Sequence, residues 1–212
     1  MYLSGNDIQS LDKIYRLNLI NSVSGIKPAN LIGTKSREGH ENLAIFSSVI
    51  HLGSNPPLIG MVTRPVDEVP RHTYANIRAT GIYTINSVSV EHREQAHYTS
   101  AKFEQDQSEF EQCGFESVYL ENFDAPFVKE SPLKLGMELV EELPIKRNGT
   151  IMLIGEIKHL FVNDDAVDQA GHIHLDQLNL AGISGLNSYY QLEKKDTFPY
   201  ARVSEWTPEQ KA

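Results

Sequence analysis

Residues 42–65 read NLAIFSSVIHLGSNPPLIGMVTRP, which is two apolar runs on either side of a Gly-Ser-Asn-Pro-Pro turn. Runs rich in Ile and Val that end at glycine and proline are typical of β-strands, so we expect strands over 42–52 and 58–63. Six or more short strands with few helices between them favour a mainly β protein with a barrel core over an alternating βαβ sheet. Comparable runs elsewhere in the chain predict strands over 29–34, 82–88, 118–120, 134–142 and 150–162. Gly155 inside the last run indicates a bulge or a close backbone contact.

Helices are expected in three places. Apolar residues at helical spacing over 8–15 predict a short amphipathic helix, with Asn6 or Asp7 as its cap. A second helix is expected over 71–80, ahead of a glycine suited to a helix C-terminus. The polar segment 91–110 is helical in composition and forms the third.

The composition limits the classes of protein to which this chain can belong. The chain has 212 residues and a single cysteine, so it can bury a core without disulfides. A formal net charge of −9 without a run of Lys or Arg argues against a nucleic-acid partner. No stretch approaches the ~18 apolar residues of a membrane span, and the N-terminus has no signal-peptide pattern. We therefore expect no membrane partner, a cytoplasmic location and one domain over 1–212, with a helical segment 1–25 and a polar tail 197–212 at its periphery.

The charge is unevenly distributed. Residues 91–145 contain 13 acidic and 4 basic residues, which gives −9 for this segment alone. Residues 26–80 contain 6 basic and 4 acidic residues, so this part of the chain is mildly basic and suited to one small anion. We expect the acidic segment to lie outside any pocket that binds such an anion.

An ordered set of motifs runs through residues 26–88. It comprises Gly33-Thr34, Asn42-x-Ala44 followed by Ser47-Ser48, Pro56-Pro57 with a strand that ends in Arg64, a Thr73-x-x-Asn76 helix start, and a strand that ends in Asn86. Their order and spacing resemble those of the flavin reductase-like family. That family includes the reductase components of two-component flavin monooxygenases and the flavoredoxins. Ser131-Pro132, the strand around Gly155 and Tyr189-Tyr190 extend the resemblance over most of the chain.

The resemblance implies a split β-barrel that binds FMN, as a homodimer with the flavin near the subunit boundary. It also implies an oxidoreductase that passes electrons from NADH or NADPH to flavin, and on to a partner monooxygenase or another acceptor. The alternative is an FMN-binding electron carrier without direct NAD(P)H turnover. The residues that the resemblance marks as cofactor-binding are Asn42, Ala44, Phe46, Ser47, Ser48, Thr63, Arg64, Arg71, His72, Thr73 and Asn76.

The phosphate of FMN needs cations, hydroxyls and N–H groups. Arg64 leaves the sheet before a proline, and a guanidinium can hold two phosphate oxygens at once. Arg71, His72 and Thr73 begin a helix, where backbone N–H groups and the helix dipole favour an anion. A purely structural reading makes Arg64 an exposed strand-end charge and Thr73 an N-cap.

The flavin ring needs a flat wall and hydrogen-bond donors at its edge. Asn42, Ser47 and Ser48 supply donors, and Ala44 and Phe46 supply the wall. The structural alternatives are a strand end whose polar side faces water for the serines, and ordinary core packing for Ala44 and Phe46.

One position departs from the family. Many of its reductases carry a histidine just before the long hydrophobic strand, near the flavin and the nicotinamide, and Thr150 occupies that place here. A threonine can only form hydrogen bonds, which puts direct NAD(P)H turnover in question and motivates the carrier alternative. Hydride transfer itself needs no protein acid or base, so catalytic residues stay open. A third hypothesis is a barrel that has lost its flavin and docks a basic partner on the acidic segment.

Four weaker sequence features are interpreted as parts of the structure and not as functional sites. His172 and His174, with Asp176, alternate as possible metal ligands but read better as an exposed edge, so no metal is expected. Cys113 lies in an acidic stretch that raises a thiol pKa, which argues against a redox role. The segment 104–112 is read as a solvated helix face, and Gly182–Gly185 as a turn.

Overall fold

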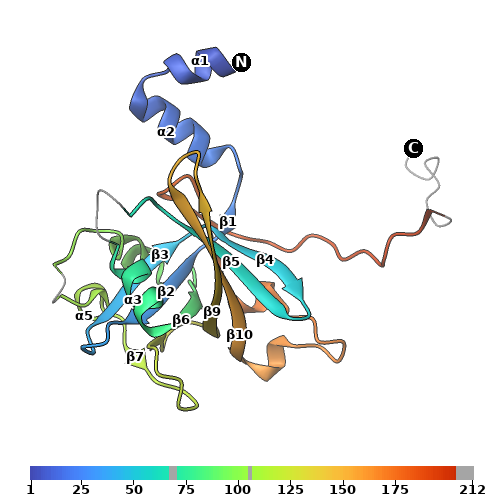
Figure 1. Ribbon diagram of the computed structural model, residues 1–212. Helices are drawn as coiled ribbons and strands as arrows, with labels where there is room; N and C mark the ends of the chain where they lie inside the picture. The colour runs from blue at the N-terminus through green and yellow to red at the C-terminus, as the bar shows by residue number, and fades with distance from the viewer. Residues whose placement is uncertain (67–70, 105–106, 204–212) are drawn as a thin grey trace.

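The computed structural model describes residues 1–66, 71–104 and 107–203 (Figure 1). Its main element is a seven-stranded antiparallel sheet in the order β3-β2-β6-β9-β10-β5-β4. The strands at its two edges are consecutive in the chain and are joined only through Ser47 and Ser48. The sheet therefore has to curl round on itself, which confirms the mainly β barrel. Its strands are β2 (Asn30–Lys35), β3 (Glu41–Phe46), β4 (Val49–Ser54), β5 (Pro57–Thr63), β6 (Ile82–Ser87), β9 (Leu133–Ile145) and β10 (Thr150–Val162).

Smaller elements surround the barrel. A three-stranded sheet has the order β1-β11-β12, and β7 pairs with β8. The short strands are β1 (Lys27–Pro28), β7 (Ser117–Val118), β8 (Phe127–Val128), β11 (Ala181–Ser184) and β12 (Ser188–Gln191). The helices are α1 (Gly5–Ser10), α2 (Lys13–Ser22), α3 (His72–Thr80), α4 (Arg93–Tyr98) and α5 (Glu109–Cys113), with 3-10 turns at Asp164–Ala166 and Leu175–Leu178.

The strand predicted over 42–52 is two strands, so that prediction was wrong at its centre. β3 ends at Phe46 and β4 begins at Val49. The two serines between them carry the chain from one edge of the sheet to the other. Apolar periodicity could not show this break, because both halves are strands of similar composition.

The helix predicted over 8–15 is also two elements. Ser4 caps α1 through its hydroxyl, and Asp12 starts α2 by accepting N–H bonds from Ile14 at 2.9 Å and Tyr15 at 3.1 Å. Asp7, expected as a cap, instead completes the capping box of Ser4 from the third helical position. The second aspartate begins a new helix because its carboxylate satisfies first-turn N–H groups.

The single helix predicted over 91–110 does not form. The described residues of this segment form only α4 and the start of α5, and residues 105–106 lie outside them. Ala96 is the one buried residue of α4, and a polar segment with so few apolar anchors cannot sustain a long helix. Among the tail residues predicted at the periphery, 197–203 are exposed and 204–212 lie outside the described range.

Two other predictions are confirmed in detail. α3 ends at Gly81, whose φ of 77° is left-handed as a C-terminal glycine requires. β10 spans the predicted 150–162, and its register against β9 shifts at Gly155, which is the expected bulge. A Cβ at Gly155 would lie 2.2 Å from the Tyr83 hydroxyl, so this glycine also permits a close packing contact.

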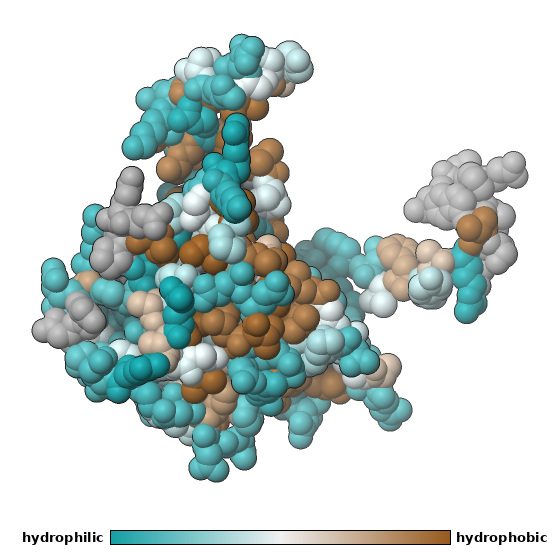
Figure 2. Space-filling model, viewed as in Figure 1, coloured by the Kyte–Doolittle hydropathy of each residue, from teal (hydrophilic) through white to brown (hydrophobic). Residues whose placement is uncertain are grey.

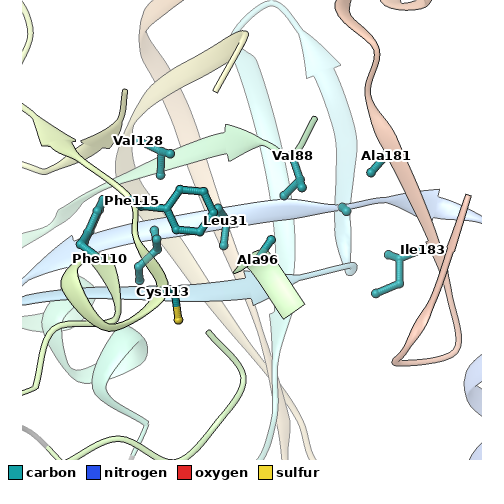
Figure 3. Packing of buried hydrophobic residues seen from close by; sticks show 11 residues of the cluster. Leu31, Val88, Ala96, Phe110, Cys113, Phe115, Val128, Ala181 and Ile183 are labelled. Carbon is teal, nitrogen blue, oxygen red and sulfur yellow. The ribbon is translucent and has the colours of Figure 1, made fainter. Parts of the chain in front are cut away.

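The core lies on both faces of the sheet. Ile32 and Tyr83 belong to a cluster inside the barrel, whereas Leu31 belongs to a second cluster that packs the sheet against α4, α5 and β11 (Figure 3). Adjacent residues of β2 thus serve opposite clusters, as the alternation of a strand requires. The second cluster fixes α5 against β3. None of the described helices is long and apolar enough to cross a membrane.

Candidate functional site

The predicted site residues lie on four segments. Ser48 of the β3–β4 junction bonds to Val62 near the end of β5, which lies beside the β9–β10 turn. The start of α3 contacts Asn42, near the other end of β3. Ile151 of β10 pairs with Thr63 of β5, so Thr150 lies beside Thr63 and Arg64. A Cβ at Gly149 would be 3.5 Å from the Pro65 ring, which places the turn directly against this segment.

The start of α3 is arranged like an anion site. Arg71 occupies the N-cap position, and no side chain of a described residue caps the helix there. The first intrahelical bond runs from the Ala75 N–H to the Arg71 carbonyl at 2.9 Å, which leaves the preceding N–H groups of the first turn for another acceptor. Such a helix start attracts a phosphate through these N–H groups and the helix dipole.

Arg71 adds a cation to this helix start. Its Nε is buried and has no hydrogen-bond partner among the described residues. A buried donor without an acceptor is costly, at about 1–3 kcal/mol, so an anion that accepts from it is a physically favourable partner. Arg64 lies at the end of β5 with an exposed side chain and can supply a second guanidinium. The residues present therefore fit a phosphate group such as that of FMN.

Thr73 is not the N-cap that its sequence position allowed. It is the second residue of α3, two positions after the N-cap Arg71, and its Oγ1 accepts a hydrogen bond from the Asn42 amide at 3.0 Å. Asn76 likewise donates to Thr34 Oγ1 at 3.1 Å. Both asparagines are buried. They therefore use their amide nitrogens to fix α3 to the β2–β3 hairpin, and those donors are committed within the protein.

The β3–β4 junction carries the residues expected around the flavin ring. The Ser48 hydroxyl donates to the Val62 carbonyl at 2.8 Å and accepts from the Val62 N–H at 3.3 Å, so it binds β5. Ser47 is half-buried and makes no side-chain hydrogen bond with a described residue, which leaves its hydroxyl available. Ala44 is half-buried, and Phe46 is half-buried against the cluster inside the barrel, so the core-packing reading applies to part of the Phe46 ring.

Thr150 begins β10 and closes the preceding turn. Its hydroxyl donates to the Asn148 side-chain oxygen at 2.8 Å, and its N–H reaches the same oxygen at 3.2 Å. The side chain is thus held by its own turn, next to the end of β5. No ionisable group stands at this position.

A small polar cavity adjoins the start of α3. Its volume is about 50 Å³, and it is lined by Ser36, His40, Glu41, Asn42, His72, Ala75, Asn76, Gln107 and Glu109. Glu109 is only 8% exposed, although it belongs to the segment expected to be solvated and outside the pocket. That expectation was wrong for Glu109, because Phe110 and Cys113 bury this turn of α5 against β3. The composition of the segment 104–112 did not indicate that Glu109 is buried, because glutamate side chains are usually exposed.

The weaker candidates contribute nothing to this site. His174 lies 3.6 Å from Asp168, and among the described residues no group of three or more His, Cys, Asp or Glu could hold a metal ion. Cys113 is buried, and burial together with the nearby Glu109 raises the pKa of its thiol, as the acidic surroundings indicated.

The fold is a barrel whose helix α3 starts without a side-chain cap from the described residues, beside the buried Nε of Arg71. A family profile described as a flavin reductase like domain matches residues 26–178. A solved split-barrel protein from Shewanella frigidimarina, provisionally assigned as a flavin reductase, is 51% identical with a TM-score of 0.91, over 95% of this chain and 100% of that one. The chain therefore belongs to the flavin reductase-like family, which confirms the resemblance and the split-barrel fold.

More distant relatives share the fold. Nitrilotriacetate monooxygenase component B from Bacillus cereus has a TM-score of 0.83 at 19% identity, covering 93% of this chain and 98% of that one. Flavoredoxin from Desulfovibrio vulgaris has a TM-score of 0.72 at 22% identity, covering 83% and 92%. An uncharacterised protein from Halalkalibacterium halodurans is 32% identical over 170 residues, which are 78% of this chain and 80% of that protein.

Proposed function

We propose that this protein binds FMN and passes electrons from NADH or NADPH through it to free flavin, a partner monooxygenase or another acceptor. The observation that carries the proposal is the start of α3, where no described residue caps the helix or bonds to the buried Nε of Arg71, in a chain whose family profile is that of flavin reductases. Membership in the family supports a flavin, and the nicotinamide donor and the acceptor are our inference.

In this proposal the bound FMN supplies a ring that accepts a hydride and releases electrons singly or in pairs. Arg64, Arg71 and the first-turn N–H groups of α3 bind its phosphate. Thr63 and Ser47 supply hydroxyls nearby, and His72 stands at the first position of the helix. Ala44 and the exposed part of Phe46 orient the ring at the mouth of the barrel. Nicotinamide and flavin then need only be held face to face, so no residue has to move a proton for the hydride step.

A second candidate is an FMN-binding electron carrier without a nicotinamide site. It is favoured by Thr150, whose hydroxyl is bound to Asn148 instead of being directed to a ligand. Such a protein would hold the same flavin through the same phosphate contacts and exchange electrons with protein partners.

Two measurements test these functions. Absorbance and fluorescence titration of the purified protein with FMN should show saturable binding, and a protein that neither contains nor takes up FMN would refute both candidates. Anaerobic stopped-flow mixing of the FMN-loaded protein with NADH and with NADPH separates them. Rapid bleaching of the flavin band by either donor supports the reductase, whereas a band that persists with both donors supports the carrier.

We further propose that residues 1–212 act as one flavin-binding domain that works as a homodimer. α1 and α2 stand away from the barrel (Figure 1), and none of their residues is buried in this single chain. Figure 2 shows apolar surface between these helices and the C-terminal segment. Helices of 6 and 10 residues are marginal in water, so a second copy that covers them supports their stability.

A further inference from the structure

The carboxylate of Glu109 is buried, and it takes no part in the phosphate contacts proposed above. Its Oε2 accepts a hydrogen bond from the backbone N–H of Leu43 at 2.9 Å. Burial raises the pKa of Glu109, and the hydrogen bond from the Leu43 N–H and, more weakly, the nearby His72 oppose that shift. Burying a carboxylate is expensive unless it is hydrogen-bonded, so this contact has a cost that simple packing by an apolar residue would avoid.

The Glu109 carboxylate meets β3 on the side that faces away from β2. β3 is an edge strand, with β2 as its only strand neighbour in the sheet, where Leu43 pairs with Gly33. An edge strand presents backbone N–H groups that no strand satisfies. Leu43 also packs in the same apolar cluster as Phe110 and Cys113 of α5. α5 therefore fixes β3 at this residue through both its side chain and its backbone.

The next residue of β3 connects this contact to the anion site. Asn42 precedes Leu43 and donates to Thr73 in the first turn of α3 at 3.0 Å. A shift of β3 at Leu43 would carry Asn42 with it and release Thr73. The contacts thus run from α5 through two consecutive residues of β3 to the helix start that is suited to a phosphate.

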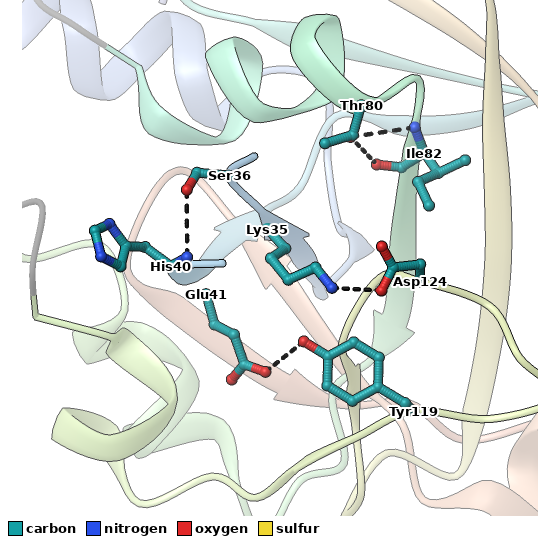
Figure 4. Close-up of polar contacts among 8 residues, drawn as sticks. All are labelled: Lys35, Ser36, His40, Glu41, Thr80, Ile82, Tyr119 and Asp124. Carbon is teal, nitrogen blue, oxygen red and sulfur yellow. Dashed lines mark hydrogen bonds and ion pairs between the residues drawn. The ribbon is translucent and has the colours of Figure 1, made fainter. Parts of the chain in front are cut away.

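The turn of the same hairpin, which adjoins Asn42, is fixed by further contacts, as Figure 4 shows. Tyr119 donates to the Glu41 carboxylate at 2.6 Å, and Lys35 forms an ion pair with Asp124. Ser36 accepts from the His40 N–H at 3.2 Å and closes the turn. These contacts fix the hairpin turn up to Glu41, and Asn76 ties α3 to Thr34 of the same hairpin. Glu109 fixes β3 on the other side of Asn42, at Leu43.

We propose that Glu109 is a positioning residue for the phosphate end of FMN. By holding the Leu43 N–H it keeps Asn42 against Thr73, and so sets the direction of the first-turn N–H groups of α3. It does so without touching the phosphate. The proposal rests on the FMN-binding function proposed above. It assigns to Glu109 a share of the preference for FMN over riboflavin, which has the same ring and ribityl chain but no phosphate.

The test compares FMN and riboflavin affinities, measured by fluorescence titration, for the wild type, Glu109→Ala, Glu109→Gln and Glu111→Ala. Glu109→Ala should bind FMN about tenfold more weakly, equivalent to about 1.4 kcal/mol, with an unchanged riboflavin affinity. Glu109→Gln should restore FMN binding, because its amide oxygen still accepts the Leu43 N–H. Glu111→Ala is the matched control, since Glu111 is exposed on the same helix.

The other possible results would contradict the proposal in distinguishable ways. Wild-type affinity of Glu109→Ala for FMN would overturn the positioning role, and so would an equal loss of FMN and riboflavin, which indicates general damage to the fold. Failure of Glu109→Gln to rescue would overturn the hydrogen-bond route. A wild type that binds riboflavin and FMN equally, or neither, would instead refute the proposed phosphate site and function.

Discussion

At the scale of single residues, Arg71 is the most informative position for function. Its position at the helix start followed from the sequence, whereas the lack of a partner for its buried Nε among the described residues did not. Arg71→Ala should weaken FMN binding by about 10- to 100-fold, because a charge-assisted bond contributes roughly 1.5–3 kcal/mol. Riboflavin affinity should stay as it is. Fluorescence titration with both ligands measures this, and Arg78→Ala, on the exposed side of the same helix, is the control.

Tyr83 offers a test of stability at the same scale. Its side chain is completely buried, and its hydroxyl has no hydrogen-bond partner among the described residues. Tyr83→Phe removes this unsatisfied group and should raise the free energy of unfolding by about 1 kcal/mol. Urea denaturation at neutral pH measures the change. A lower midpoint would show that the hydroxyl is satisfied, for example by a buried water.

Glu109 predicts a pH dependence. Its pKa is raised in the folded protein, mainly by burial, so the folded state binds this proton more tightly than the unfolded state. The contribution of the group to the free energy of unfolding is therefore complete below its unfolded pKa and declines as pH rises through the folded value. The stability of Glu109→Gln relative to the wild type should therefore increase as pH rises above the unfolded pKa of a glutamate, about 4.3. Urea denaturation of both proteins at increasing pH measures the difference, and a pH-independent difference would contradict the prediction.

At the scale of elements, β10 and α3 show what local patterns can predict. The apolar run over 150–162 and the glycine after Thr80 gave their bounds closely, because each has a local cause in strand propensity or in a left-handed glycine. The break at Ser47 and Ser48 has no such cause. It exists because β3 and β4 take opposite edges of one sheet, which is a property of strand order.

Gly155 tests packing between elements. Its missing Cβ leaves room for the Tyr83 hydroxyl from β6, and a side chain there would clash with it and approach Met137. Gly155→Ala should lower the free energy of unfolding by about 1–3 kcal/mol through overpacking. Gly5→Ala is the control, because a Cβ at that glycine meets nothing within 4 Å. Urea denaturation compares the two, and equal effects would show that the barrel wall relaxes freely.

At the scale of the whole molecule, the two chain ends leave from neighbouring positions. Ile26 and Leu192 both pack over Gly182 of the three-stranded sheet, and the N-terminal helices and the C-terminal segment project from there in different directions (Figure 1). Ile14 is 60% exposed and Val23 is 74% exposed on α2 and just after it. Such apolar exposure on ordered segments is typical of an interface.

We expect the second copy to cover these segments. Combined Ile14→Ser and Val23→Ser substitutions should shift the protein from dimer to monomer, because they remove apolar area from the interface. Light scattering after size-exclusion chromatography measures the mass at several concentrations. Asn18→Ser, an exposed polar change on the same helix, is the control. A wild type that is monomeric throughout would reject the dimer, and a double variant that stays dimeric would place its interface elsewhere.

The charge distribution also belongs to this scale. The excess of acidic residues over 91–145 was expected to stay away from the site, and most of these acids are exposed. Glu142 contacts α3 by accepting a hydrogen bond from Tyr74 at 3.0 Å, and Glu109 is the one buried acid among the described residues of this segment. The tertiary fold brings it to the start of α3, where it meets residues 37 and 66 positions earlier in the chain, His72 and Leu43.

The sequence by itself determined the strand content, the helix over 71–80 with its final glycine, the Gly155 bulge and the family, through motifs whose causes are local or whose order is kept along the chain. Only the tertiary structure decided which hydroxyls and amides remain available to a ligand. Asn42, Asn76, Ser48 and Thr150 all use side-chain groups to bind the protein itself, whereas Arg71 has a buried donor that no described residue pairs with. The physical reason is that a hydrogen bond between distant segments depends on where strand order and packing bring them, and residue type alone does not contain that information.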